Sequence, residues 1–149
     1  IWFILPAYFA NAAPVVAGGG PPIDMGKKLG DGRRILGGGK TIRGFLVGFI
    51  VGSLVGILQG RWFIGPLLAL GALLGDLANS FLKRRMGIAR GGAAPGLDQL
   101  SLLVGALLLA SLIEVPSLEV ILALLILTPP IHLGTNFIGY KLGLKDRPY

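Results

Sequence analysis

The sequence contains no cysteine, and only 14% of its 149 residues carry a charge. The absence of cysteine excludes disulfide bonds, thiolate metal ligands and a cysteine nucleophile. A soluble domain carries about 25% charged residues. The shortage of charge, together with 53% hydrophobic residues, therefore indicates an integral membrane protein. The length is enough for one domain, and we expect residues 1–149 to form a single transmembrane domain.

Five apolar stretches are candidates for transmembrane helices, because a helical span needs roughly 20 predominantly apolar residues. They cover 1–17, 44–60, 62–82, 99–115 and 120–140. The predicted fold class is therefore all-α, with five transmembrane helices joined by polar loops. Pro129 and Pro130 are expected to bend the last span.

The basic residues decide the expected orientation. Thirteen of the 14 lie in segments 18–43 and 83–90 and in the tail after 140, whereas Arg61 lies alone between the second and third spans. These three segments share one side of the membrane if the chain crosses it five times. The positive-inside rule makes that side cytoplasmic. We therefore expect a multi-pass protein of the cell membrane, with the N-terminus outside and the C-terminus and functional site facing the cytoplasm.

The second predicted span carries glycine at every fourth position, from Gly44 to Gly60. This spacing creates a flat helix face that another helix can approach closely. The neighbour could come from the same subunit or from a second copy in a homodimer. We favour packing within one subunit and leave the homodimer open.

Polar side chains share one face of the third predicted span, at spacings of three and four residues. The stripe and the two arginines that follow it are Asp76, Asn79, Ser80, Lys83, Arg84 and Arg85. An acid inside a span needs a partner from protein, water or a cation. The alternative to a functional site is a structural ion pair of Asp76 with Lys83 or with an arginine.

A second acid, Asp98, stands beside Gln99 just before the fourth predicted span. Two carboxylates at adjoining helix ends predict a Mg²⁺ site at Asp76 and Asp98, because Mg²⁺ uses one or two carboxylates plus substrate phosphates. The alternative role for Asp98 is the N-cap of the fourth helix.

The first loop ends in a glycine run followed by Lys40, Thr41 and Arg43. It resembles the end of a P-loop, but Arg34 stands where that pattern requires glycine and no strand precedes it. Free backbone N–H groups, a lysine and a helix start still suit a phosphate. The alternative is a flexible linker.

His132, the only histidine, is expected to form a hydrogen bond between helices rather than to catalyse a reaction.

Several of these segments resemble the CDP-archaeol synthases, which are similar to CDP-diacylglycerol synthases. The matching segments are Asp31 to Gly37, Gly39 to Gly44, Gly75-Asp76 with Ser80 to Arg85, Pro95 to Leu100, and Asn136 to Asp146. The chain departs from the family pattern at Gly38, where an Asp usually stands. It also has Ser101 where the bacterial signature has a second Asp.

The resemblance implies a Mg²⁺-dependent nucleotidyltransferase that converts CTP and 2,3-bis-O-geranylgeranyl-glycerol 1-phosphate into CDP-archaeol and pyrophosphate. Its implied catalytic residues are Asp76, Asp98 and Lys83, with the two acids as metal ligands. Its implied nucleotide- and phosphate-binding residues are Lys40, Thr41, Arg43, Asn79, Ser80, Arg84, Arg85 and Gln99. The lipid tails would enter from the bilayer between helices, along grooves lined by glycine.

Two other protein classes are alternatives. A CDP-alcohol phosphotransferase clusters several aspartates, but the one Asp-Gly pair, Asp31-Gly32, lacks those partners. A transporter or channel could use Asp76, yet the outer halves of the spans are nearly all apolar. The net charge of +7 could serve nucleic acid, anionic lipid or phosphorylated ligands. We expect membrane topology and phosphates to account for it, with no nucleic-acid partner.

Overall fold

The computed structural model describes all residues except 146 and 149, so the last residue of the resemblance, at position 146, lies outside it. The described residues form five α-helices and no β-strand, which confirms the all-α prediction. A 3₁₀ turn, Trp2–Ile4, precedes the first helix. The helices are α1 (Leu5–Ala17), α2 (Ile42–Leu58), α3 (Ile64–Arg85), α4 (Leu97–Ala110) and α5 (Leu118–Lys141). Each overlaps one predicted span, with ends displaced by up to five residues.

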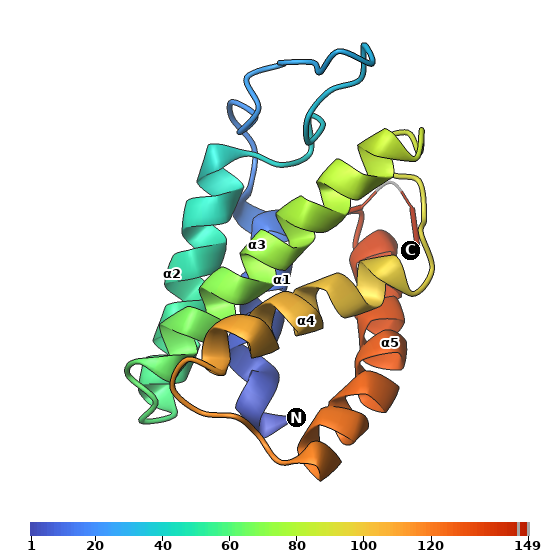
Figure 1. Cartoon of the computed structure of the whole chain (residues 1–149). Helices are drawn as coiled ribbons and strands as arrows, with labels where there is room; N and C mark the ends of the chain where they lie inside the picture. The colour runs from blue at the N-terminus through green and yellow to red at the C-terminus, as the bar shows by residue number, and fades with distance from the viewer. Residues whose placement is uncertain (146, 149) are drawn as a thin grey trace.

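Helices α1 to α4 form a bundle in which α3 packs against the other three (Figure 1). Its main core contains fully buried Ile4 of the 3₁₀ turn, Leu68 of α3 and Leu103 and Ala106 of α4. The core combines alanines with leucines and isoleucines, so the helices can pack closely. This bundle is the framework that holds the polar end of the site.

The glycines of α2 are covered within the subunit. A Cβ atom on Gly52 would lie 2.6 Å from the carbonyl oxygen of Pro6 and 2.6 Å from the Cβ of Ala69. One turn further, Gly56 meets Gly65 of α3 backbone to backbone. Packing inside one subunit, the favoured alternative, is therefore confirmed for this face, and a homodimer stays a prediction.

A second close approach joins α3 to α4. A Cβ atom on Gly75 would lie 2.1 Å from the carbonyl oxygen of Ser101, so this crossing requires glycine. Gly71 and Gly105 are in similar contact one turn away. Because Asp76 follows Gly75 directly, the crossing carries this acid to the neighbourhood of the first turn of α4.

Helix α5 lies to one side of the bundle and packs mainly on α4 (Figure 1). It continues through Pro129 and Pro130 without interruption. Helices α3 and α5 are long and apolar enough to cross a membrane, while the other three are shorter apolar helices. Half of the apolar window of α3 is buried inside the protein, compared with 11% of that of α5. Helix α5 thus exposes most of its surface.

Candidate active site

A cavity of about 1290 Å³ opens between the bundle, the first loop and α5. One end is polar and is formed by the first loop, α3 and the start of α4. The rest continues between α1 and α5 and is largely apolar. Nine of the 11 predicted site residues line it: Lys40, Thr41, Asp76, Asn79, Ser80, Lys83, Arg84, Asp98 and Gln99. Arg43 and Arg85 are not among the lining residues.

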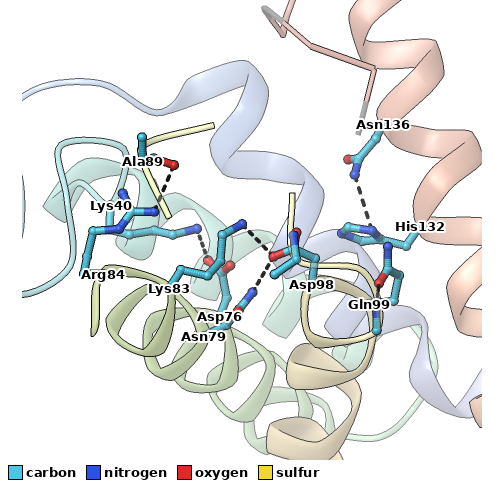
Figure 2. A network of polar contacts seen from close by, with 12 residues as sticks. Lys40, Asp76, Asn79, Lys83, Arg84, Ala89, Asp98, Gln99, His132 and Asn136 are labelled. Carbon is cyan, nitrogen blue, oxygen red and sulfur yellow. Dashed lines mark hydrogen bonds and ion pairs between the residues drawn. The ribbon is translucent and has the colours of Figure 1, made fainter. Parts of the chain in front are cut away.

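The two predicted acids each pair with a different lysine (Figure 2). Lys40 Nζ of the first loop donates to Asp76 Oδ2 at 2.5 Å. Lys83 Nζ donates to Asp98 Oδ1 at 2.8 Å. The suggested Asp76–Lys83 pair is therefore wrong, although Asp76 does form an ion pair. The first loop thus supplies the partner of Asp76, and α3 supplies the partner of Asp98.

Asp98 receives two further hydrogen bonds. Asn79 Nδ2 donates to its Oδ1 at 2.8 Å, and the backbone N–H of Ala94 donates to its Oδ2 at 2.7 Å. The N-cap of α4 is Gly96, so the N-cap alternative for Asp98 is wrong, and Asp98 lies in the first turn. Gln99 performs the capping instead, since its Oε1 accepts the N–H of Gly96 at 2.6 Å.

The first loop is folded, which contradicts the flexible-linker alternative. Its two ends pair through the N–H of Ile23, which donates to the carbonyl of Lys40 at 2.8 Å. Thr41 then caps α2, because its Oγ1 accepts the N–H of Gly44 at 3.1 Å. The loop therefore presents Lys40 to Asp76 from a fixed position.

Asp24 organises this loop, and sequence reasoning missed it. Its side chain is fully buried and receives a 2.5 Å hydrogen bond from Arg34 Nη2. Three backbone N–H groups also donate to it, those of Gly26, Leu36 and Gly37. Although burial opposes ionisation, these hydrogen bonds hold the pKa of the Asp24 carboxyl well below its usual range. The sequence offers one signal for this role: Asp24 is an isolated acid just before the basic residues of the loop.

Two of the predicted arginines have different roles. Arg84 lines the cavity, lies against Gly37 and donates through Nη2 to the carbonyl of Ala89 at 3.3 Å. Arg85 instead donates to Asp31 Oδ2 at 2.7 Å and to the carbonyl of Arg34 at 2.6 Å. It thereby fastens the first loop to α3, outside the cavity.

Helix α5 contributes a polar group that faces the acids across the cavity. Asn136 Nδ2 and His132 Nδ1 are 3.3 Å apart, one turn from each other on this helix (Figure 2). The prediction that His132 bonds to another helix is therefore wrong, because its partner lies on α5 as well.

The two lysines near the end of α5 differ in position. Lys141 does not line the cavity and lies over the ring of Phe137. Lys145, which sequence reasoning did not select, does line it.

The donor atoms near the acids fit a hard cation. Asp76 and Asp98 supply carboxylate oxygens, and Asn79 Oδ1 is buried without a hydrogen-bond partner in the described part of the chain. No group of three or more His, Asp or Glu residues gathers anywhere among those residues. Two carboxylates completed by water and substrate phosphates match the way proteins hold Mg²⁺.

The fold and the cavity define a class: a helical protein of the membrane type with paired acids and lysines at one end of a cavity that continues past apolar side chains. The chain belongs to the CDP-archaeol synthase family, whose model matches residues 1–65 and 61–149. The CDP-archaeol synthase of Thermococcus gammatolerans is 50% identical, covering 100% of this chain and 94% of the relative. That of Methanopyrus kandleri is 51% identical, covering 100% and 91%. A solved intramembrane enzyme for archaeal membrane lipid biosynthesis has a TM-score of 0.84 and 47% identity, with 91% of each chain covered.

Proposed function

We propose that the protein transfers the cytidylyl group of CTP to the phosphate of an archaeal ether lipid, 2,3-bis-O-geranylgeranyl-glycerol 1-phosphate. The observation that carries this proposal is the shape of the cavity. Its polar end holds two acids and several cations, as a charged triphosphate requires. Its other end continues between α1 and α5 past apolar side chains, as two isoprenoid chains require.

The reaction needs no protein nucleophile. An oxygen of the lipid phosphate attacks the α-phosphorus of CTP, and a new P–O–P bond forms. The bond between the α-phosphorus and the bridging oxygen breaks, and pyrophosphate leaves with the electron pair. The attacking phosphate is already ionised at neutral pH, so no general base is required. Catalysis then depends on positioning and on neutralising charge, which suits a site without cysteine.

The lysines would exchange partners when substrate binds. Lys40 and Lys83 neutralise Asp76 and Asp98 in the free protein. Triphosphate oxygens entering the cavity would draw the two ammonium groups away, because a phosphate carries more charge than a carboxylate. The guanidinium of Arg84, which lines the cavity, would be a further donor to phosphate.

Asp76 and Asp98, with the Asn79 amide oxygen beside them, would hold Mg²⁺. Bound there, the ion would supply positive charge to triphosphate oxygens and to the leaving pyrophosphate. Release of Lys40 and Lys83 toward the phosphates would leave both carboxylates available as ligands. The acids would thus act on the triphosphate through Mg²⁺, and the lysines would bind its oxygens directly.

The structure favours a path for the lipid tails other than the glycine-lined grooves. Glycine grooves of α2 and α3 are filled by neighbouring helices and offer no room. The cavity instead passes between Phe9 and Val16 of α1 and Leu133 and Ile138 of α5, all of them exposed. We propose that the two chains enter from the bilayer between α1 and α5.

We also propose that all five helices cross the membrane, with the site and the C-terminus on the cytoplasmic side. The ends of the helices alternate, and Arg61 pairs with Glu114 at 2.5 Å at the end remote from the site. The chain has no cysteine of its own. Arg61→Cys and Arg90→Cys should therefore react with an impermeant maleimide from opposite sides of sealed vesicles. Labelling of both from the same side would contradict five crossings.

The catalytic proposal is tested with Asp76→Asn and Asp98→Asn. Each variant should lose at least about 100-fold in Mg²⁺-dependent CDP-lipid formation, the order seen when one electrostatic stabiliser of a transition state is removed. The two losses should not add, because both acids act on one group of phosphates. Turnover and thermal unfolding should be measured on the same purified samples.

Asp31→Asn is the matched control. Asp31 is partly exposed and pairs with Arg85 outside the cavity, and the hydrogen bond from Arg85 to the carbonyl of Arg34 does not depend on Asp31, so turnover should stay nearly unchanged. The phosphotransferase alternative, which relies on Asp31-Gly32, predicts instead that Asp31→Asn loses turnover. Near-normal turnover in Asp76→Asn would contradict the assignment of Asp76 as a metal ligand.

A further inference from the structure

The chain reverses direction where α5 ends. Gly143, at φ +70°, adopts the left-handed conformation, and its N–H donates to the carbonyl of Tyr140. The next N–H, from Leu144, donates to the carbonyl of Gly139 at 2.9 Å. This pair of hydrogen bonds is a Schellman motif, which ends a helix and turns the chain back along it. The residue that returns is Lys145.

The returning lysine is held at two points. A Cβ atom on Gly139 would lie 3.7 Å from Lys145 Cγ and Cδ, so the aliphatic stem passes directly over this glycine. Nζ donates to Asn136 Oδ1 at 2.5 Å. Asn136 is itself 8% exposed and is oriented by His132. The ammonium group is therefore positioned inside the cavity, on the wall that α5 forms.

The partner of Lys145 sets it apart from the other cavity lysines. Among the described residues, Lys40 and Lys83 each pair with a carboxylate, whereas the hydrogen bond of Lys145 goes to a neutral amide. Burial lowers the pKa of Lys145 and the nearby Lys40 lowers it further, while Asp76 and Asp98 offset part of this decrease. Burial and Lys40 both disfavour the charged form, and an anion arriving beside Nζ would relieve these effects.

The location of Lys145 distinguishes between the two phosphates of the reaction. Asp76, Asp98, Arg84 and the first loop form one wall of the cavity, which we call the bundle wall. The triphosphate is proposed to bind there. Lys145 belongs to the α5 wall, and Ile138 and Leu142 of the same wall line the path proposed for the lipid chains. A lipid that entered there would bring its phosphate toward Asn136 and Lys145, which line the same cavity.

We propose that Lys145, held by Asn136 over Gly139, binds the phosphate of the lipid substrate and places its attacking oxygen. This inference rests on the proposed function. In this arrangement the cationic side chains of the bundle bind the nucleotide, and Lys145 beside α5 binds the lipid phosphate.

The test uses Lys145→Met, which keeps the stem over Gly139 and removes the charge, and Lys145→Arg, which restores a cation. KM for lipid phosphate is measured at saturating CTP, and KM for CTP at saturating lipid. Loss of a hydrogen bond to a charged group corresponds to about a 10- to 100-fold rise in KM for the lipid. KM for CTP should stay within about twofold of wild type, and Lys145→Arg should recover most of the lipid affinity.

Lys141→Met is the control, since Lys141 is the last residue of α5 but lies over Phe137 and outside the cavity. It should leave both KM values unchanged. Direct CTP binding to each purified variant reports whether the bundle wall is intact. The proposal is overturned if Lys145→Met raises KM for CTP alone, raises neither constant, or abolishes CTP binding. Absence of CDP-lipid formation by the wild-type protein would instead refute the proposed function.

Discussion

The bundle of α1 to α4 and the fifth helix are built by different rules. The bundle helices meet backbone to backbone, as at Gly52 against Pro6 and at Gly75 against Ser101. Helix α5 has open space around Gly134, and 11% of its apolar window is buried, compared with half of that of α3. Within a bilayer, close packing rather than the hydrophobic effect drives helix association. The bundle should therefore be rigid, and α5 more weakly attached.

The difference matches the two demands of the proposed reaction. A nucleotide site needs cations and acids held at fixed separations, and the bundle supplies Asp76 and Asp98 from helices that cross at glycine. A lipid with two long chains needs a wall that can yield as it enters from the bilayer. Helix α5 supplies this wall and also carries the lysine assigned to the lipid phosphate.

The largest expected effect comes from adding a side chain where the bundle has no space. Gly52→Leu places a branched side chain against the Pro6 carbonyl and Ala69, and overpacking of this kind costs about 1–3 kcal/mol or more. Thermal unfolding in detergent should occur at a clearly lower temperature. We expect turnover to fall as well, because α2 begins at the loop that presents Lys40.

Gly134→Leu is the matched change in α5. Nothing lies within 4 Å of a Cβ atom at this position, so the side chain should extend into the bilayer. Replacing a helical glycine should stabilise the helix by up to about 1 kcal/mol. Equal losses of stability in Gly52→Leu and Gly134→Leu would show that the two regions do not differ in packing.

Hydropathy and charge predicted the helices well because both depend on local sequence. All five stretches became helices, and the basic segments share the end of the molecule that carries the site. The spacing of Asp76, Asn79 and Lys83 also predicted one polar face correctly. These patterns survive because the helix period alone determines which side chains lie together.

The partners of those side chains could not be predicted in the same way. Lys83 pairs with Asp98 rather than with Asp76 because the Gly75–Ser101 contact sets how α4 crosses α3. Arg85 turns away from the cavity because the loop folded around Asp24 offers it carbonyl groups and Asp31. Both outcomes depend on contacts between residues far apart in sequence, which no local pattern specifies.

The smallest expected effect concerns the attachment of α5 to α1. Tyr8 Oη and Thr128 Oγ1 lie 2.8 Å apart, and Thr128 is fully buried. Hydrogen bonds between membrane helices contribute about 0.6 kcal/mol on average. We therefore expect Tyr8→Phe, Thr128→Val and the double variant to give a coupling free energy of that order in a double-mutant cycle of unfolding.

Ser53→Ala is the control for this cycle, because Ser53 Oγ of α2 is buried without a hydrogen-bond partner in the described residues. Its removal should leave stability unchanged or slightly raised, since an unsatisfied hydroxyl disappears. Thr128→Val should cost more than Tyr8→Phe. Valine leaves the Tyr8 hydroxyl unpaired, whereas a threonine without its partner can bond to the carbonyl one turn earlier in its own helix. A coupling energy of several kcal/mol would mean that α5 is fixed as firmly as the bundle helices, and a yielding lipid wall would then have to be abandoned.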